Sequence, residues 1–141
     1  MSITTCSIMR RACQSRHKEA PVNDITRYHT GEKLSRVVVH NGIAYLCGQV
    51  DPNYMEHPED IEAQTRGVLT RIDGHLSEAG TDKSRMLFCG VHIRDITLAP
   101  KMNAFWNDWL KDCAPPARCC VQAEMAKPQI LVEITVQAAL P

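Results

Sequence analysis

The sequence predicts a small α/β domain: one mixed six-stranded sheet with two helices on a single face, in the order β-β-β-α-β-α-β-β. Three observations support this prediction. Asn41-Gly42, the strongest short hairpin signal, separates two apolar, β-branched runs. Two later segments repeat apolar residues at helical spacing, and two alternating segments of strand type end the chain.

Charge and hydropathy exclude some classes of partner. The chain has 141 residues, the size of one domain, and a formal net charge of zero. Proteins held to nucleic acid or to anionic membrane by their overall field usually carry a basic excess, so neither partner is expected. No apolar run approaches the roughly 18–20 residues that a membrane helix needs.

The N-terminal segment differs from the rest of the chain. Residues 1–18 hold four basic residues and no Asp or Glu, and the folded domain is expected to span 24–141. Residues 1–23 are interpreted as a flexible basic tail or, alternatively, as an organelle presequence. The seven cysteines are odd in number and show no C-x-x-C spacing, which favours a reducing compartment, here the cytoplasm.

The elements are expected in the following places. Strands at 25–29, 35–40 and 43–48 are followed by a helix over about 58–79, which Gly80 ends. A strand at 86–93, a helix from about 98–100 to 110, and strands at 117–125 and 130–138 complete the chain. Two strands that are joined by a helix are expected to run parallel to each other in the sheet. Two helices cover only one face of such a sheet, so the other face is expected to meet a second copy of the chain.

The last two strands alternate polar and apolar residues. Arg118 and Cys120 share one face of the first, and Glu133 lies on the polar face of the second. Both polar faces are predicted to lie on the side without helices. The planar fork of Arg118 matches a carboxylate, although a structural ion pair across a subunit boundary explains it equally well. Glu133 could likewise belong to a structural ion pair, or its carboxylate could orient a water molecule.

The spacing of these two residues raises a geometric question. If the last two strands formed a tight hairpin, Glu133 would lie opposite Gln122, roughly 13 Å from Arg118 along the sheet. Either another strand intervenes or a subunit boundary brings the two together. The remaining candidates show neither the spacing of metal ligands nor that of a catalytic triad. His92 is interpreted as a core or interface residue, and Asn103, on the sequence alone, as a residue exposed to solvent.

Several motifs resemble one family. Residues 116–121 (PARCCV) resemble the PAR-x-C-V signature of the RidA/YjgF-like reactive intermediate deaminases. Residues 43–49 (IAYLCGQ) are similar to the family's strand ending in S-G-Q, and 103–106 (NAFW) to its N-x-x-Y. Gln64, 76–80 (LSEAG) and 132–134 add to a resemblance that covers roughly residues 25–141.

The resemblance implies a fold like trimeric chorismate mutase and a homotrimer with clefts at the subunit interfaces. It implies hydrolysis of reactive 2-imino or enamine acids to 2-keto acids and ammonia, with no cofactor and no metal. Carried over by position, Arg118 binds the substrate carboxylate and Glu133 holds the attacking water. The backbone around Gly48 and Cys120 contacts the substrate, and Asn103 lies near the cleft.

The chain departs from the family pattern at one cleft position. Leu34 stands where active members carry a tyrosine, and Trp106-x-x-Trp109 resembles a divergent branch whose members are not all active. A non-catalytic protein that binds a small carboxylate is therefore the alternative function. An RNA-directed role, as endoribonuclease or translation inhibitor, is a further alternative that the neutral charge disfavours.

Overall fold

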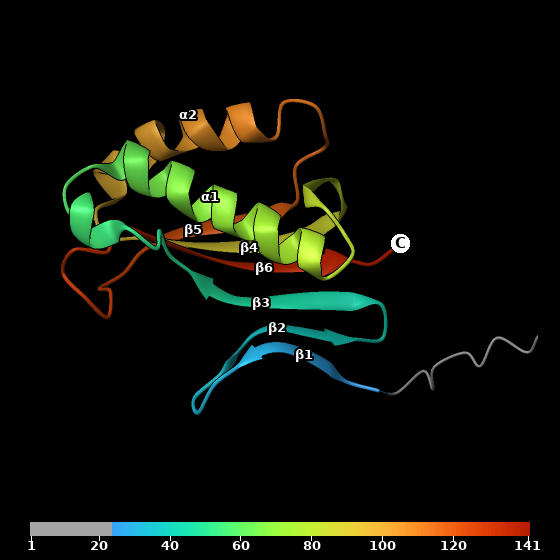
Figure 1. Ribbon diagram of the computed structural model, residues 1–141. Coiled ribbons are helices and arrows are strands. Elements are labelled where there is room, and N and C mark those ends of the chain that lie inside the picture. The colour runs from blue at the N-terminus through green and yellow to red at the C-terminus, as the bar shows by residue number, and fades with distance from the viewer. Residues whose placement is uncertain (1–23) are drawn as a thin grey trace, which may run out of the picture.

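Six strands and two helices follow one another in the predicted order (Figure 1). The structure is a computed structural model that describes residues 24–141, so the expected basic tail lies outside the described residues. The strands are β1 (Thr26–Thr30), β2 (Ser35–His40), β3 (Ile43–Gln49), β4 (Met86–Ile93), β5 (Ala117–Gln122) and β6 (Val132–Ala139). The helices are α1 (Ile61–Glu78) and α2 (Ala99–Trp109).

The sheet is mixed, as predicted, with the strand order β1-β2-β3-β6-β4-β5. The last strand in the sequence, β6, runs antiparallel to β3 on one side and to β4 on the other. Among the described strands, β4 and β5 form the one parallel pair. Because β4 lies between β5 and β6, the last two strands do not form a hairpin.

Local signals in the sequence place the turn and the helix end. Asn41 and Gly42 have φ of 49° and 75°, so the β2–β3 turn has φ > 0 at both central positions, as predicted. The side chain of Asp60 caps α1 by accepting a hydrogen bond from the Ala63 N–H at 3.0 Å. Gly80, with φ of 85°, follows the end of α1.

The core lies between the helices and one face of the sheet. Figure 1 shows both helices on the same side, over the half of the sheet that contains β4, β5 and β6. The apolar stripe of α1 is buried, as predicted, and fully burying one such side chain stabilises the fold by about 1.5–3 kcal/mol. The buried residues of the two helices include Ile61, Val68, Leu69, Ile72, Leu76, Met102 and Trp106.

The other face of the sheet carries no helix among the described residues. Tyr45 and Phe88 both pair with Gln137 and therefore share this open face, where they are 41% and 38% exposed. Val121, in register with His92 of the same face, is 45% exposed. Large apolar side chains in this position fit a surface that meets another protein surface. No helix within residues 24–141 is both long and apolar enough to cross a membrane.

Candidate functional site

The prediction that Arg118 and Cys120 point to the open face is wrong. Arg118 pairs with Cys89, and Cys89 pairs with Val136, and both of these partners are buried beneath the helices. Residues paired across strands share a face, so Arg118 lies on the helix side. The intervening residue, Cys119, is exposed and lies on the open face.

The reason for this orientation is the position of β5 at the edge of the sheet. An edge strand is only partly covered by the helical layer, so an arginine there keeps part of its contact with solvent. Helix α2 offers it two partners. Arg118 Nη1 donates a hydrogen bond to Asn103 Oδ1 at 2.8 Å, and the guanidinium lies 5.0 Å from the centre of the Trp106 ring. Asn103, expected to be solvated on sequence alone, thus orients Arg118.

Arg118 has donors left over. Within residues 24–141 it donates one side-chain hydrogen bond, to Asn103, and no carboxylate lies within ion-pair distance of it. Arginine carries five N–H donors in a planar fork. A half-buried arginine held by an amide and an aromatic ring, but not neutralised, is suited to bind an anion that arrives from solution.

The cysteines near Arg118 are poor nucleophiles. Burial raises the pKa of the Cys89 thiol to about 12, although the charge of Arg118 opposes this shift. Burial also raises the pKa of Cys120, again against the charge of Arg118. Because the thiolate is the reactive form, neither side chain is set up for covalent catalysis near neutral pH.

Glu133 and Gly48 meet on the open face. Glu133 lies near the start of β6, and the register of β3 against β6 shifts between Leu46 and Gln49. A Cβ atom on Gly48 would overlap the Glu133 carboxylate, so only glycine leaves room for this side chain. The absence of a side chain at Gly48 therefore determines where the Glu133 carboxylate can lie.

His92 lies directly opposite Glu133 across the β4–β6 pair, and sequence reasoning missed its connection to the site. The two side chains line one cavity of about 250 Å³ together with Ala123, Glu124, Met125 and Ala126. His92 Nδ1 is buried and has no hydrogen-bond partner among the described residues. The signal in the sequence was a polar ring within an otherwise apolar strand.

Leu34 lies at the same end of the sheet as Gly48. The antiparallel register Val37 to Leu46 puts the start of β2 beside the end of β3. Leu34 is 52% exposed and lines a shallow depression with Arg36 and the β1–β2 turn. Burial raises the pKa of the nearby Cys47 thiol, and the charge of Arg36 opposes that shift.

Within one chain, Arg118 and Glu133 do not meet. Arg118 is in register with Cys89 and Glu133 with His92, three positions further along β4. Three residues along the sheet and two strand spacings across it separate their backbones by roughly 14 Å. Their side chains also lie on opposite faces, so no small substrate can contact both in the same chain.

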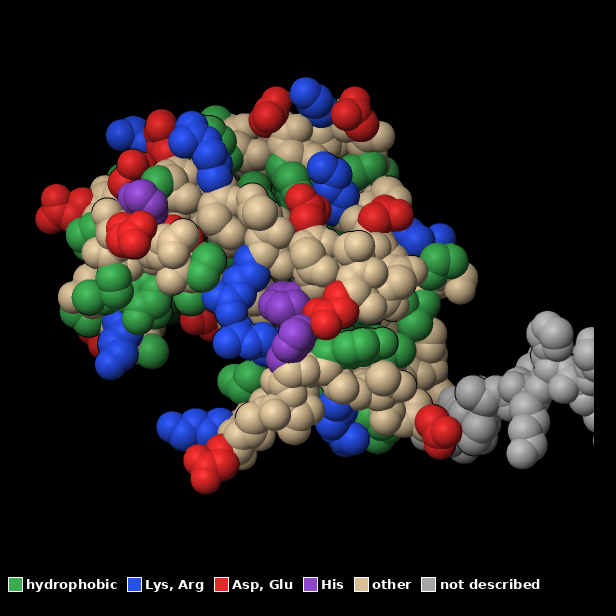
Figure 2. Space-filling model, in the orientation of Figure 1, with side chains coloured by type: hydrophobic (Ala, Val, Ile, Leu, Met, Phe, Trp, Pro, Cys, Tyr) green, Lys and Arg blue, Asp and Glu red, His purple; other side chains and the backbone are tan. Residues whose placement is uncertain are grey.

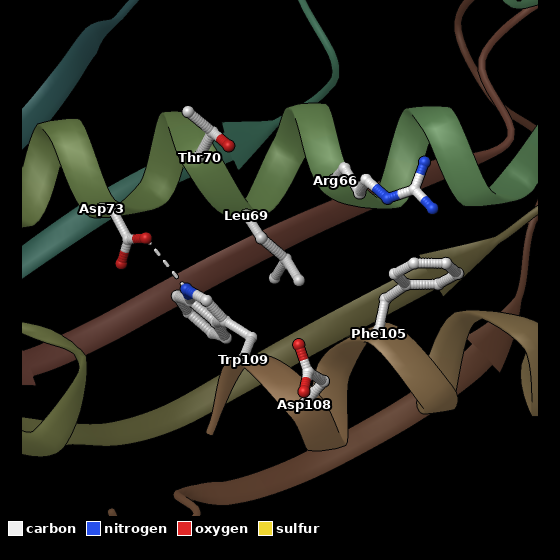
Figure 3. A pocket seen from close by; sticks show the side chains of 7 residues that line it. All are labelled: Arg66, Leu69, Thr70, Asp73, Phe105, Asp108 and Trp109. Atoms are coloured by element: carbon white, nitrogen blue, oxygen red, sulfur yellow. Dashed lines mark hydrogen bonds between the residues drawn. The ribbon is translucent and has the colours of Figure 1, made fainter. Parts of the chain in front are cut away.

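A separate groove runs between α1 and α2 (Figure 3). Its volume is about 290 Å³, and two contacts cross it: Trp109 Nε1 donates to Asp73 Oδ2 at 2.9 Å, and Arg66 lies 4.4 Å from the centre of the Phe105 ring. None of the residues expected in the site lines this groove. These contacts join the two helices.

Comparisons with known proteins decide the family. A family model described as "Endoribonuclease L-PSP" matches residues 25–140. The chain belongs to this YjgF/RidA/RutC family. A RutC family protein of Haemophilus ducreyi is 36% identical over 116 residues, which cover 82% of this chain and 97% of the relative.

Other members of the family extend the comparison. The 3-aminoacrylate deaminase RutC of Acinetobacter baylyi is 34% identical over 107 residues, covering 76% of this chain and 82% of that protein. The crystal structure of a YjgF family member from Neisseria meningitidis has a TM-score of 0.80 and 35% identity. It covers 85% of this chain and 98% of its own, so the YjgF-like fold expected from the motifs is confirmed.

Proposed function

We propose that this family member hydrolyses reactive 2-imino or enamine acids to 2-keto acids and ammonia. The observation that carries the proposal is Arg118, a half-buried arginine held by Asn103 and Trp106 and left without a carboxylate partner among the described residues. Such an arginine binds a carboxylate in bidentate fashion. A relative that is named a deaminase supports the same class of reaction.

The complete site is proposed to form between two copies of the chain, in a homotrimer. Arg118 comes from one protomer and Glu133 from its neighbour, because the two cannot meet within a chain. The exposed apolar residues of the open face support an oligomer, since covering them removes apolar surface from water. Gly48, His92 and Glu133 then belong to one half of the site, and Arg118, Asn103 and Cys120 to the other.

The proposed reaction needs the protein mainly to position the substrate and a water molecule. Arg118 holds the carboxylate of the substrate, and Glu133 accepts a hydrogen bond from a water and directs its oxygen at the imine carbon. The C–O bond forms as the C=N π electrons move to nitrogen. Glu133 takes one proton from the attacking water and passes it to that nitrogen. The new hydroxyl then loses its remaining proton as the C=O bond forms, and the C–N bond breaks to release ammonia and leave the keto acid. A protonated imine is already electrophilic, so orientation supplies most of the acceleration.

The backbone near Gly48 and Cys120 is proposed to contact the polar groups of the substrate, and Leu34 to lie at the rim. Leucine offers no hydroxyl there, which limits the polar contacts the rim can make with a substrate. A cytoplasmic location is part of the proposal. It is supported by the five described cysteines, all of which are free.

The test is hydrolysis of imines generated in place by an amino-acid oxidase, with several amino acids as sources. Wild type is expected to release keto acid faster than buffer, and Arg118→Ala to lose at least about 100-fold in kcat/KM, as expected when a charged anchor is removed. Arg66→Ala, which removes an arginine stacked on Phe105 at the helical groove, is the matched control and should keep full activity.

Absence of wild-type activity on every imine tried would reject the deaminase function for those substrates. The non-catalytic alternative, which the departure at Leu34 favours, then makes its own prediction. Binding of 2-keto acids would raise the melting temperature of wild type but not of Arg118→Ala. It would also change tryptophan fluorescence, because the Arg118 guanidinium lies over Trp106.

A further inference from the structure

We propose that His29, His75 and Glu78 form a binding site for a divalent transition-metal ion, with Zn²⁺ as the ion of choice. The three residues come from two elements that are far apart in the sequence, the strand β1 and the last turn of α1. Their ligand atoms all lie within 4.8 Å of one another. None of the three residues is among those proposed to contact the substrate, although His29 and Leu34 line one depression.

The distances place the three groups around one point. His29 Nε2 lies 2.8 Å from both carboxylate oxygens of Glu78. His75 Nδ1 lies 3.5 Å from Glu78 Oε2, and the two imidazole rings have their centres 5.7 Å apart. An ordinary histidine–carboxylate contact needs only two of these groups. The third brings the set to two imidazoles and a carboxylate, which is a common ligand set for zinc.

The backbone holds one ligand in an unusual conformation. His29 has φ of 52°, in the left-handed region that residues with a side chain rarely adopt. This conformation directs the imidazole from β1 towards α1. His75 and Glu78 are three positions apart on α1 and therefore lie on the same side of the helix. Figure 2 shows two adjacent histidines against an acidic side chain near the centre of this face.

The charge and exposure of the cluster suit a cation. The Glu78 carboxylate supplies a negative charge, and the two imidazoles, when neutral, supply nitrogen lone pairs that can bind a metal. His75 is 12% exposed, Glu78 36% and His29 48%. The site is thus open on one side, and a water molecule can complete a four-coordinate zinc.

A bound metal would tie the β1–β2 hairpin to the end of α1. Leu34 and the turn that carries it lie in this hairpin, beside the depression that His29 also lines. The expected consequence of binding is a more stable hairpin, because a ligand that binds only the folded state stabilises it.

The test is calorimetric titration of chelator-treated full-length protein with ZnCl₂. Wild type is expected to bind about one more Zn²⁺ per chain than either His29→Ala or Glu78→Gln. The matched control, His57→Ala, removes a histidine outside the cluster and should bind like wild type. Zn²⁺ should also raise the melting temperature of wild type and of the control, but not of the two cluster variants.

Two results would overturn the proposal. One is a stoichiometry and affinity that do not change in either cluster variant. The other is a Co²⁺ complex whose absorption shows thiolate-to-metal charge transfer and survives both substitutions, since that would place the metal on cysteines. If His29→Ala fails to fold, Glu78→Gln still tests the site, because glutamine keeps the size of the side chain and its capacity to hydrogen-bond.

Discussion

Arg118 and Glu133 lie on opposite faces of the sheet, in strands that β4 separates. A single chain therefore presents a carboxylate-binding group on its helix side and a water-orienting group on its open side. If both act on one substrate, the chemistry depends on how the copies assemble.

Gly48→Ala should lower activity without unfolding the protein. The new Cβ overlaps the Glu133 carboxylate, so this side chain must leave its position. We expect a fall of at least about 10-fold in kcat, in line with the loss of an oriented catalytic group. Gly74→Ala is the control, because nothing lies within 4 Å of its new Cβ on α1. It should keep activity and stabilise the helix by about 0.5–1 kcal/mol. Wild-type kinetics for Gly48→Ala would argue against a role for Glu133 in that position.

Asn103→Ala should weaken substrate binding more than it slows turnover. It removes the acceptor that orients Arg118 Nη1 but leaves the charge and the contact with Trp106. The expected cost is about 1–2 kcal/mol, or roughly 5–30-fold in KM. Asn107→Ala on the same helix serves as the control, since Asn107 is exposed. Steady-state kinetics of both variants are the measurement, and equal KM values would show that Arg118 needs no such support.

His92→Phe should lower kcat by about 10-fold and leave the oligomer intact, the size of effect typical when one hydrogen-bonding group near the reaction is lost. Phenylalanine keeps a ring in the cavity but removes the nitrogen that faces no partner among the described residues. His40→Phe changes a histidine of the same sheet face at the far end of β2 and should be neutral in turnover. Kinetics with size-exclusion chromatography make the comparison. Equal losses in both variants would assign the effect to the interface.

Cys89 should make the protein less stable at high pH. Its folded-state pKa of about 12 lies above the ordinary value of 9.0, so the folded state holds this proton more tightly than the unfolded chain. Stability is therefore complete below pH 9 and falls as pH rises towards 12, by at most about 1.4 kcal/mol per pH unit. Urea unfolding between pH 8 and pH 11 should show a steeper loss for wild type than for Cys89→Ala. Parallel curves for the two proteins would contradict the assignment.

The sequence predicted the elements whose causes are local. Asn41-Gly42 forms the β2–β3 turn because both residues tolerate positive φ. The apolar stripe of α1 predicts a helix that packs one face against a sheet. The mixed sheet with both helices on one face followed from the same patterns. The resemblance to the family then singled out Arg118 and Glu133 as candidate site residues, which no spacing rule would have paired.

What the sequence did not reveal depends on contacts between distant segments. The insertion of β6 between β3 and β4 is a matter of sheet assembly, and no local pattern records it. The alternation in β5 predicted that Arg118 lies on the open face, but it lies on the helix side. An edge strand beneath a short helix accommodates an arginine on the covered face, where Asn103 accepts its hydrogen bond. His29 approaches α1 only through tertiary folding, so its spacing from Glu78 carried no signal.

The most direct test of the two-chain site mixes two inactive variants. Arg118→Ala and Glu133→Gln are purified separately, then unfolded together and refolded in equal amounts, with each variant refolded alone as the control. If one site takes Arg118 from one copy and Glu133 from the next, random assembly gives intact sites at about a quarter of the wild-type number, and that share of the activity returns. If the mixture stays as inactive as the separate variants although mixed oligomers form, the two residues do not act together across a subunit boundary.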